Sequence, residues 1–174
     1  MIRASASLMR LGSFHIVAAA TYASALESLG PSSSCRLAKN GVLAPSADHA
    51  VAYWKALSVR IELRTYGAMP GGKNGCTSPS SIHVSTVRVT GGEWHTTRGL
   101  RVGDTVAKLT LRYPAAKRAN DLPGWYHHGY WLVTRPVGGY EGIGGLRRTV
   151  PVLVAETSKG RVFAFVFVVD GEGE

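Results

Sequence analysis

One stretch of this chain decides how it folds: Thr97-Arg98-Gly99-Leu100-Arg101-Val102-Gly103-Asp104-Thr105-Val106-Ala107-Lys108-Leu109, closed by Tyr113-Pro114. It predicts an extended run, a glycine turn and a short helix. Asp104 suits the N-cap position, because its carboxylate can accept hydrogen bonds from the free amides of the first turn. Val106, Leu109 and Tyr113 recur at spacings of three and four, which puts them on one apolar stripe. A helix of about two to three turns is marginal alone, so we expect this stripe to pack on a sheet.

Strands are predicted on both sides of that helix. From Leu57 to Thr65, apolar side chains alternate with polar and charged ones, a period of two that is typical of a half-buried strand. Further extended runs cover residues 82–89, 126–134, 149–156 and 161–169, and the last two form a terminal hairpin. The final strand is apolar on both faces, which predicts a place in the middle of the sheet or under a covering element. We therefore predict an α+β domain over residues 56–170, with a single antiparallel β-sheet of about five strands and one short helix packed on it.

The first 55 residues have a different character. Arg3 and Arg10 belong to a small, mostly apolar segment that ends in Ala23-Ser24-Ala25, the pattern of a signal peptide over residues 1–25. The alternative is an amphipathic or disordered N-terminal tail. Proline and glycine interrupt residues 26–55, which predicts an irregular arm or linker. Residues 171–174 end the chain as an acidic tail, and no transmembrane anchor is predicted.

The composition is basic. The 174 residues include 20 lysines and arginines against 11 acidic residues, a formal net charge of +9. Such a balance favours anionic partners, among them nucleic acid, anionic lipid and acidic wall polymer. The charges are spread along the chain and no recognised nucleic-acid-binding motif accompanies them, so a nucleic-acid-binding protein is the less favoured interpretation.

The two cysteines, Cys35 and Cys76, bear on the compartment. In an exported protein we expect them to pair, and closing a loop of about forty residues would stabilise the fold by roughly 4 kcal/mol in the loop-entropy model. The alternative is two unrelated thiols in a cytoplasmic protein, which applies if residues 1–25 are not a signal. Neither cysteine belongs to a CxxC pair, so the sequence predicts no zinc site.

Two other patterns were weighed for chemistry. His127 and His128 are adjacent, so on a strand they point to opposite faces and cannot bind one metal ion without a bulge. We predict no metal and no cofactor, and we keep His127 or His128 with Glu141 as candidate catalytic residues. The glycines of residues 138–145 precede a strand instead of opening a helix, so they do not fit a phosphate-binding loop.

Aromatic residues give the sequence its main binding hypothesis, because large rings with a polar edge stack on sugars and bases. The alternative is that the strand over 126–134 simply buries its aromatic face in the core. The candidate ligand-binding residues are the aromatic side chains of this region with two nearby arginines: Trp94, Trp125, Tyr126, Tyr130, Trp131, Tyr140, Arg147 and Arg148.

Over about residues 57–169 the chain resembles a family of small exported actinobacterial proteins of unknown function. The resemblance rests on the spacing of Cys76, the strand over 82–89, the segment from Trp94 to Asp104, Leu109, Tyr113-Pro114, Tyr130-Trp131-Leu132-Val133 and Gly160-Arg161-Val162. No catalytic residues are known for that family, so none is carried over. The turn before the helix is also similar to small α+β modules of envelope-assembly proteins and β-lactamase-inhibitor proteins, which implies a binding module and not an enzyme.

These observations favour an exported, non-enzymatic binding or structural module of the cell envelope. The expected partner is an envelope protein or an anionic polymer. The first alternative is a hydrolase that acts on an anionic cell-wall polymer, and the second is a nucleic-acid-binding protein.

Overall fold

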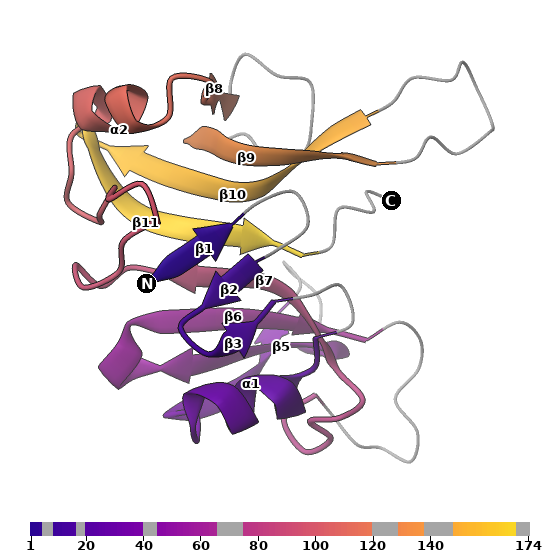
Figure 1. Ribbon diagram of the computed structural model, residues 1–174. Helices are drawn as coiled ribbons and strands as arrows, with labels where there is room; N and C mark the ends of the chain where they lie inside the picture. Colours follow the sequence, from indigo (N-terminus) through magenta and orange to yellow (C-terminus); the bar gives the residue numbers. More distant parts are fainter. Residues whose placement is uncertain are drawn as a thin grey trace.

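The computed structural model describes residues 1–4, 9–16, 20–39, 45–65, 75–119, 129–137 and 148–169. Within these ranges the protein is an α+β structure with one large sheet, one small sheet and two α-helices (Figure 1). The predicted α+β class is confirmed. The prediction of a single sheet of about five strands with one helix was wrong, because the described residues form an eight-stranded sheet, a second small sheet and two helices.

The large sheet is antiparallel throughout, and its strands lie in the order β4-β5-β6-β7-β11-β10-β9-β8. Figure 1 shows it strongly twisted, with β7 and β11 side by side in its middle. The strand bounds are Ser34–Lys39 for β4, Pro45–Trp54 for β5, Val59–Arg64 for β6, His83–Val89 for β7, Lys117–Arg118 for β8, Tyr130–Val137 for β9, Arg148–Ser158 for β10 and Arg161–Val168 for β11.

The prediction of an irregular arm over residues 26–55 was wrong. This region contains the end of helix α1 (Tyr22–Leu29), strands β4 and β5, and a 3-10 turn, η1, over Lys55–Leu57. The residues taken as breakers do not interrupt these elements. Pro31 lies between α1 and β4, and Pro45 is the first residue of β5, where proline removes no hydrogen bond from the interior of the ladder.

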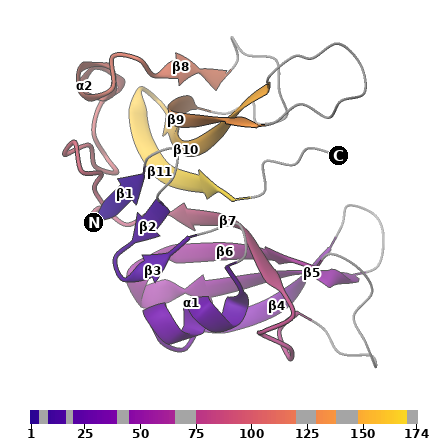
Figure 2. The ribbon, with the colours of Figure 1, turned by 45° about the vertical axis from the view of Figure 1, so that its right-hand side comes forward.

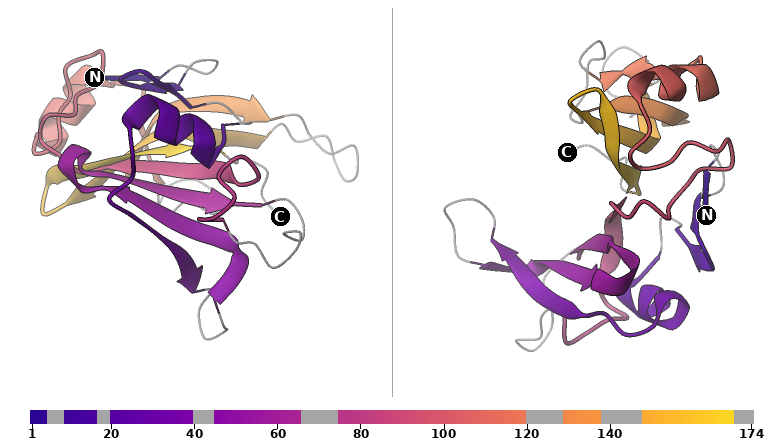
Figure 3. Two further views of the ribbon diagram at one scale, coloured as in Figure 1. Left: turned by 90° about the horizontal axis from the view of Figure 1, so that it is seen from below. Right: turned by 90° about the vertical axis from the view of Figure 1, so that its left-hand side faces the viewer.

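The N-terminal segment covers one face of the large sheet. Strands β1 (Ile2–Ala4), β2 (Met9–Leu11) and β3 (Phe14–His15) form a small antiparallel sheet. This sheet and α1 lie on the same side of the large sheet (Figures 2 and 3). Thr21 caps α1 in a capping box with Ser24.

The N-terminal segment contributes side chains to the main core. Ile2, Leu11, Phe14 and Ala25 are fully buried in the main core, and the Ile2 amide donates a hydrogen bond to the His95 carbonyl at 2.7 Å. Residues predicted to form a removable signal are therefore part of the folded domain. Their apolar character, which suggested a signal sequence, is explained by burial in this core.

The sheet separates two apolar clusters. The main core lies between the large sheet and the layer formed by β1–β3, α1 and α2 (Val106–Arg112), and it includes Phe165 and Phe167 of β11. A second cluster lies on the other face and contains Ala119, Trp131, Val154, Val166 and Val168. Strand β11 contributes to both clusters. Its place between β7 and β10 confirms the central position predicted for it. No described helix is long and apolar enough to cross a membrane.

Candidate functional site

Several of the predicted site residues lie outside the described part of the chain. These are the catalytic candidates His127, His128 and Glu141 and the ligand-binding candidates Trp125, Tyr126, Tyr140 and Arg147. Arg148 begins β10, but its side chain is also outside the description. The catalytic and ligand-binding roles of these residues stay predictions.

The aromatic residues that are described do not form one open cluster. Trp94 belongs to the main core, and its indole Nε1 donates a hydrogen bond to the Leu57 carbonyl at 2.7 Å. Trp131 is buried in the second cluster, on the opposite face of the sheet. Tyr130 packs against the main core and is only partly exposed. Adjacent residues of β9 point to opposite faces, so Tyr130 and Trp131 pack against different clusters.

The predicted pairing of Cys35 with Cys76 is confirmed. The disulfide joins β4, the edge strand of the large sheet, to the turn that precedes β7, and the two Cα atoms are 5.7 Å apart. Gly75 beside it faces Ala50 and Ile82 so closely that a Cβ atom at this position would lie 2.1 Å from Ile82 Cδ1. The turn can approach the core this closely because residue 75 has no side chain.

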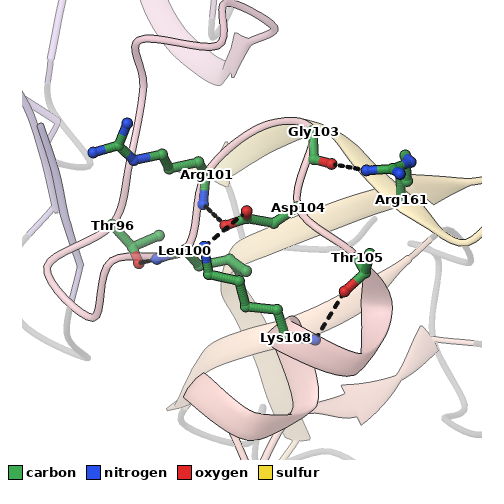
Figure 4. A network of polar contacts seen from close by, with 8 residues as sticks. All are labelled: Thr96, Leu100, Arg101, Gly103, Asp104, Thr105, Lys108 and Arg161. Atoms are coloured by element: carbon green, nitrogen blue, oxygen red, sulfur yellow. Dashed lines mark hydrogen bonds and ion pairs between the residues drawn. The ribbon is translucent and has the colours of Figure 1, made fainter.

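The segment that decides the fold forms a network of polar contacts between the helix and β11 (Figure 4). The prediction that Asp104 is the N-cap was wrong, because Thr105 caps α2 and accepts a hydrogen bond from the Lys108 amide at 3.2 Å. Asp104 instead accepts from the Arg101 amide at 2.7 Å and pairs with the Lys108 ammonium at 2.9 Å. Its carboxylate closes the glycine turn one residue before the helix.

Electrostatics agree with a structural role for this turn. Burial raises the pKa of Asp104, but the hydrogen bonds from Lys108 and from the Arg101 amide, with the charges of both residues, outweigh it and lower the pKa overall. A general acid near neutral pH would need the opposite shift. At the other end of α2, Arg98 donates to the Arg112 carbonyl at 3.2 Å and its guanidinium lies over the Tyr113 ring, a favourable charge at a helix C-terminus.

The most unusual side chains lie on the face of the sheet opposite the main core. The β-ladders align Tyr53 of β5, Arg60 of β6 and Arg88 of β7 as direct cross-strand neighbours, followed by Val166 of β11. Direct partners point to the same face. Two further residues join this set, because the Arg36 guanidinium lies over the Tyr53 ring and the Arg88 guanidinium lies over the Phe163 ring. We call these five residues the charged row: Arg36, Tyr53, Arg60, Arg88 and Phe163.

Arg60 and Arg88 form a like-charge pair at the centre of the charged row. Like charges directly opposite each other on neighbouring strands are destabilising. Two carboxylates offset part of this repulsion: Glu62 pairs with Arg60 at 2.7 Å, and Glu156 pairs with Arg88. In each pair a carboxylate oxygen meets the Nη2 atom of the arginine. Neither guanidinium Nε finds a hydrogen-bond partner in the described structure.

A pocket of about 360 Å³ opens beside this pair, where the β5–β6 connection approaches the end of β7. Its cationic groups are Lys55, Arg60 and Arg88, and Tyr53 forms part of its wall. Ser58 and Thr90 join the lining, and the Thr90 amide donates to the Ser58 carbonyl at 3.0 Å. The pocket therefore combines cations, hydroxyls and two aromatic residues, Tyr53 and Trp54.

In the part of the chain that the structure describes, no group of three or more histidine, cysteine or acidic side chains is arranged to hold a metal ion. The charged row and the residues beside it present guanidinium and ammonium donors, carboxylate acceptors and hydroxyls that do both.

No family model, curated protein or solved structure matches this chain. The resemblance to small exported actinobacterial proteins stays a prediction.

Sequence reasoning missed the charged row for a specific reason. The alternation of residues 57–65 already placed Arg60, Glu62 and Arg64 on one face. Tyr53 and Arg36, however, belong to the region predicted as an irregular arm. The register of three strands is needed before Arg60 and Arg88 become neighbours, and alternation within one strand carries no information about its partners.

Proposed function

We propose that this protein is a non-enzymatic binding module that works outside the reducing cytosol and takes an anionic ligand on the charged row. The disulfide supports the compartment, because such bonds persist in oxidising environments. The cell envelope is the proposed location within that compartment. Its ligand would be an envelope protein or an anionic polymer.

The observation that carries the binding role is the Arg60–Arg88 pair beside the pocket. Stability alone does not favour two guanidinium groups directly opposite each other. An anion in the pocket would relieve that repulsion and use guanidinium donors that the two carboxylates leave free. The net charge of +9 would also attract an anionic ligand from a distance.

Cosedimentation with isolated cell envelopes from the native host tests this proposal. We expect the wild-type protein to sediment with the envelopes and to be released by salt, because screening weakens exposed charge pairs. The variant Lys55→Gln with Arg60→Gln should stay in the supernatant. Arg101→Gln with Arg112→Gln is the matched control, because it removes the same charge from exposed positions around α2.

Two results would contradict the proposal. Equal sedimentation of both double variants would show that the charged row is not the binding surface. Failure of the wild-type protein to sediment at low salt would remove the envelope role itself. Thermal unfolding of each variant shows whether it is folded under the conditions of the assay.

A further inference from the structure

We propose that the pocket beside the charged row selects an acidic saccharide, in which a carboxylate sits among hydroxyl groups on a sugar ring. This inference rests on the proposed function and names the chemical class of its ligand. The geometry that points to it is the mixture of donors and acceptors around the pocket, together with a cation that no described carboxylate neutralises.

The mixed pairs suit sugar hydroxyls. A hydroxyl group donates one hydrogen bond and accepts others, so it can bridge a guanidinium and a carboxylate that lie side by side. The Arg60–Glu62 pair presents such a combination beside the pocket, with side chains 36% and 28% exposed, whereas Glu156, the partner of Arg88, is buried. Tyr53 adds an aromatic wall, against which the apolar face of a sugar ring can lie.

The remaining cation suits a single carboxylate. None of the ion pairs among the described residues involves Lys55, whose backbone amide is held by the Ser33 hydroxyl at 3.0 Å. Lys55 is exposed at the rim of the pocket, on the short η1 turn. Its ammonium can therefore approach a ligand carboxylate without first giving up a protein partner.

The same carboxylates disfavour a nucleic-acid backbone. Proteins that track phosphates present stripes of lysine and arginine, and their affinity comes from the phosphates they neutralise. On the charged row, Glu62 and Glu156 stand beside the two central arginines and would repel a series of phosphates. The row offers little net charge at its centre, and Lys55 at the pocket edge joins none of the ion pairs formed among the described residues, which matches one anionic group per ligand unit.

Isothermal titration of the full chain with three probes tests the inference: tri-galacturonate, neutral maltotriose and a deoxythymidine oligonucleotide. We expect tri-galacturonate to bind and maltotriose to bind at least about tenfold more weakly, because it lacks the charge-assisted contact. Lys55→Gln should lower the affinity for tri-galacturonate by about tenfold and leave maltotriose unchanged. Arg101→Gln, which removes an exposed charge distant from the pocket, should change neither affinity.

Arg60→Gln provides a second test, since its side chain is the more exposed of the two central arginines and its loss should leave the fold intact. Equal affinity for tri-galacturonate and maltotriose would overturn carboxylate selection. Tighter binding of the oligonucleotide would replace the saccharide with a phosphate polymer. Wild-type binding by Lys55→Gln and by Arg60→Gln would show that the pocket is not the site.

Different results would overturn the envelope-binding proposal and the acidic-saccharide proposal. Salt-sensitive envelope binding that depends on the charged row, with no heat of binding for tri-galacturonate, overturns only the saccharide class. Saccharide binding in the pocket without envelope sedimentation overturns only the envelope role.

Discussion

The two faces of the large sheet carry different kinds of side chains. The core face carries fully buried apolar residues such as Phe165 and Phe167, and a layer of α1, α2 and the small sheet covers it (Figure 3). On the opposite face, β5, β6 and β7 carry the central part of the charged row, with Arg60 and Arg88 only partly buried. One face is arranged for stability, whereas the other retains a like-charge pair that stability alone would remove. This contrast is why we place recognition on the charged face.

Removing the layer over the core face should have the largest effect. A chain that begins at Leu26 lacks five large buried side chains, each of which contributes about 1.5–3 kcal/mol by burial: Ile2, Leu11, Phe14, Ile16 and Tyr22. Because their sum is comparable with a typical total stability of about 5–15 kcal/mol, we expect this shortened chain to lack cooperative thermal unfolding, measured by circular dichroism. A stable, cooperative fold would return residues 1–25 to the role of a removable signal.

Alanine substitutions at two phenylalanines of β11 compare the stability contributions of the two faces within one strand. Phe165→Ala should lower the free energy of unfolding by about 3–5 kcal/mol, because it leaves a cavity in the main core. Phe163→Ala should cost less than about 1 kcal/mol, since this ring is 40% exposed and contacts Arg88. Chemical denaturation of both variants measures the difference. Similar losses would mean that the charged face contributes as much to stability as the core face.

The disulfide ties the edge strand β4, which also carries Arg36, to the turn before β7. Replacing Cys35 and Cys76 by serine should lower the free energy of unfolding by about 2–4 kcal/mol, since the bond closes a loop across a sequence separation of 41 residues. Urea denaturation measures the loss, and Arg36 on the same strand should become less well held over Tyr53. Unchanged stability after reduction would show that β4 is fixed by its ladder with β5 alone.

Asp104 lies outside both faces and should give the smallest effect. Asp104→Asn should cost no more than about 1 kcal/mol at neutral pH, because its partner Lys108 is 40% exposed and solvent screens the pair. The lowered pKa of Asp104 means that its carboxylate stabilises the fold above the ordinary carboxyl pKa of about 3.9. That contribution is lost as the pH falls through the native pKa, so wild type and variant should converge in acid denaturation. A constant difference down to acidic pH would contradict this assignment.

Local patterns were sufficient where one strand or helix faces a single environment. Period-two alternation located β6, and the stripe of Val106, Leu109 and Tyr113 located α2 within a residue of its bounds. Local patterns failed for β4 and β5. There, proline and glycine residues outside or at the ends of the strands were interpreted as interruptions of an irregular segment. Local patterns failed also for Asp104, because Asp104 and Thr105 are both good N-cap residues and only the backbone geometry chooses between them.

The sequence by itself determined the α+β class and the terminal hairpin, since alternation and turn residues act over short distances. It predicted the pairing of its two cysteines only for an exported protein, and the tertiary structure shows that they pair. Only the tertiary structure decided that the apolar N-terminal segment covers the core, and that Trp94 and Trp131 lie buried on opposite faces. The charged row likewise exists only after strands far apart in the chain adopt one register, because a cross-strand neighbour is a property of two strands together.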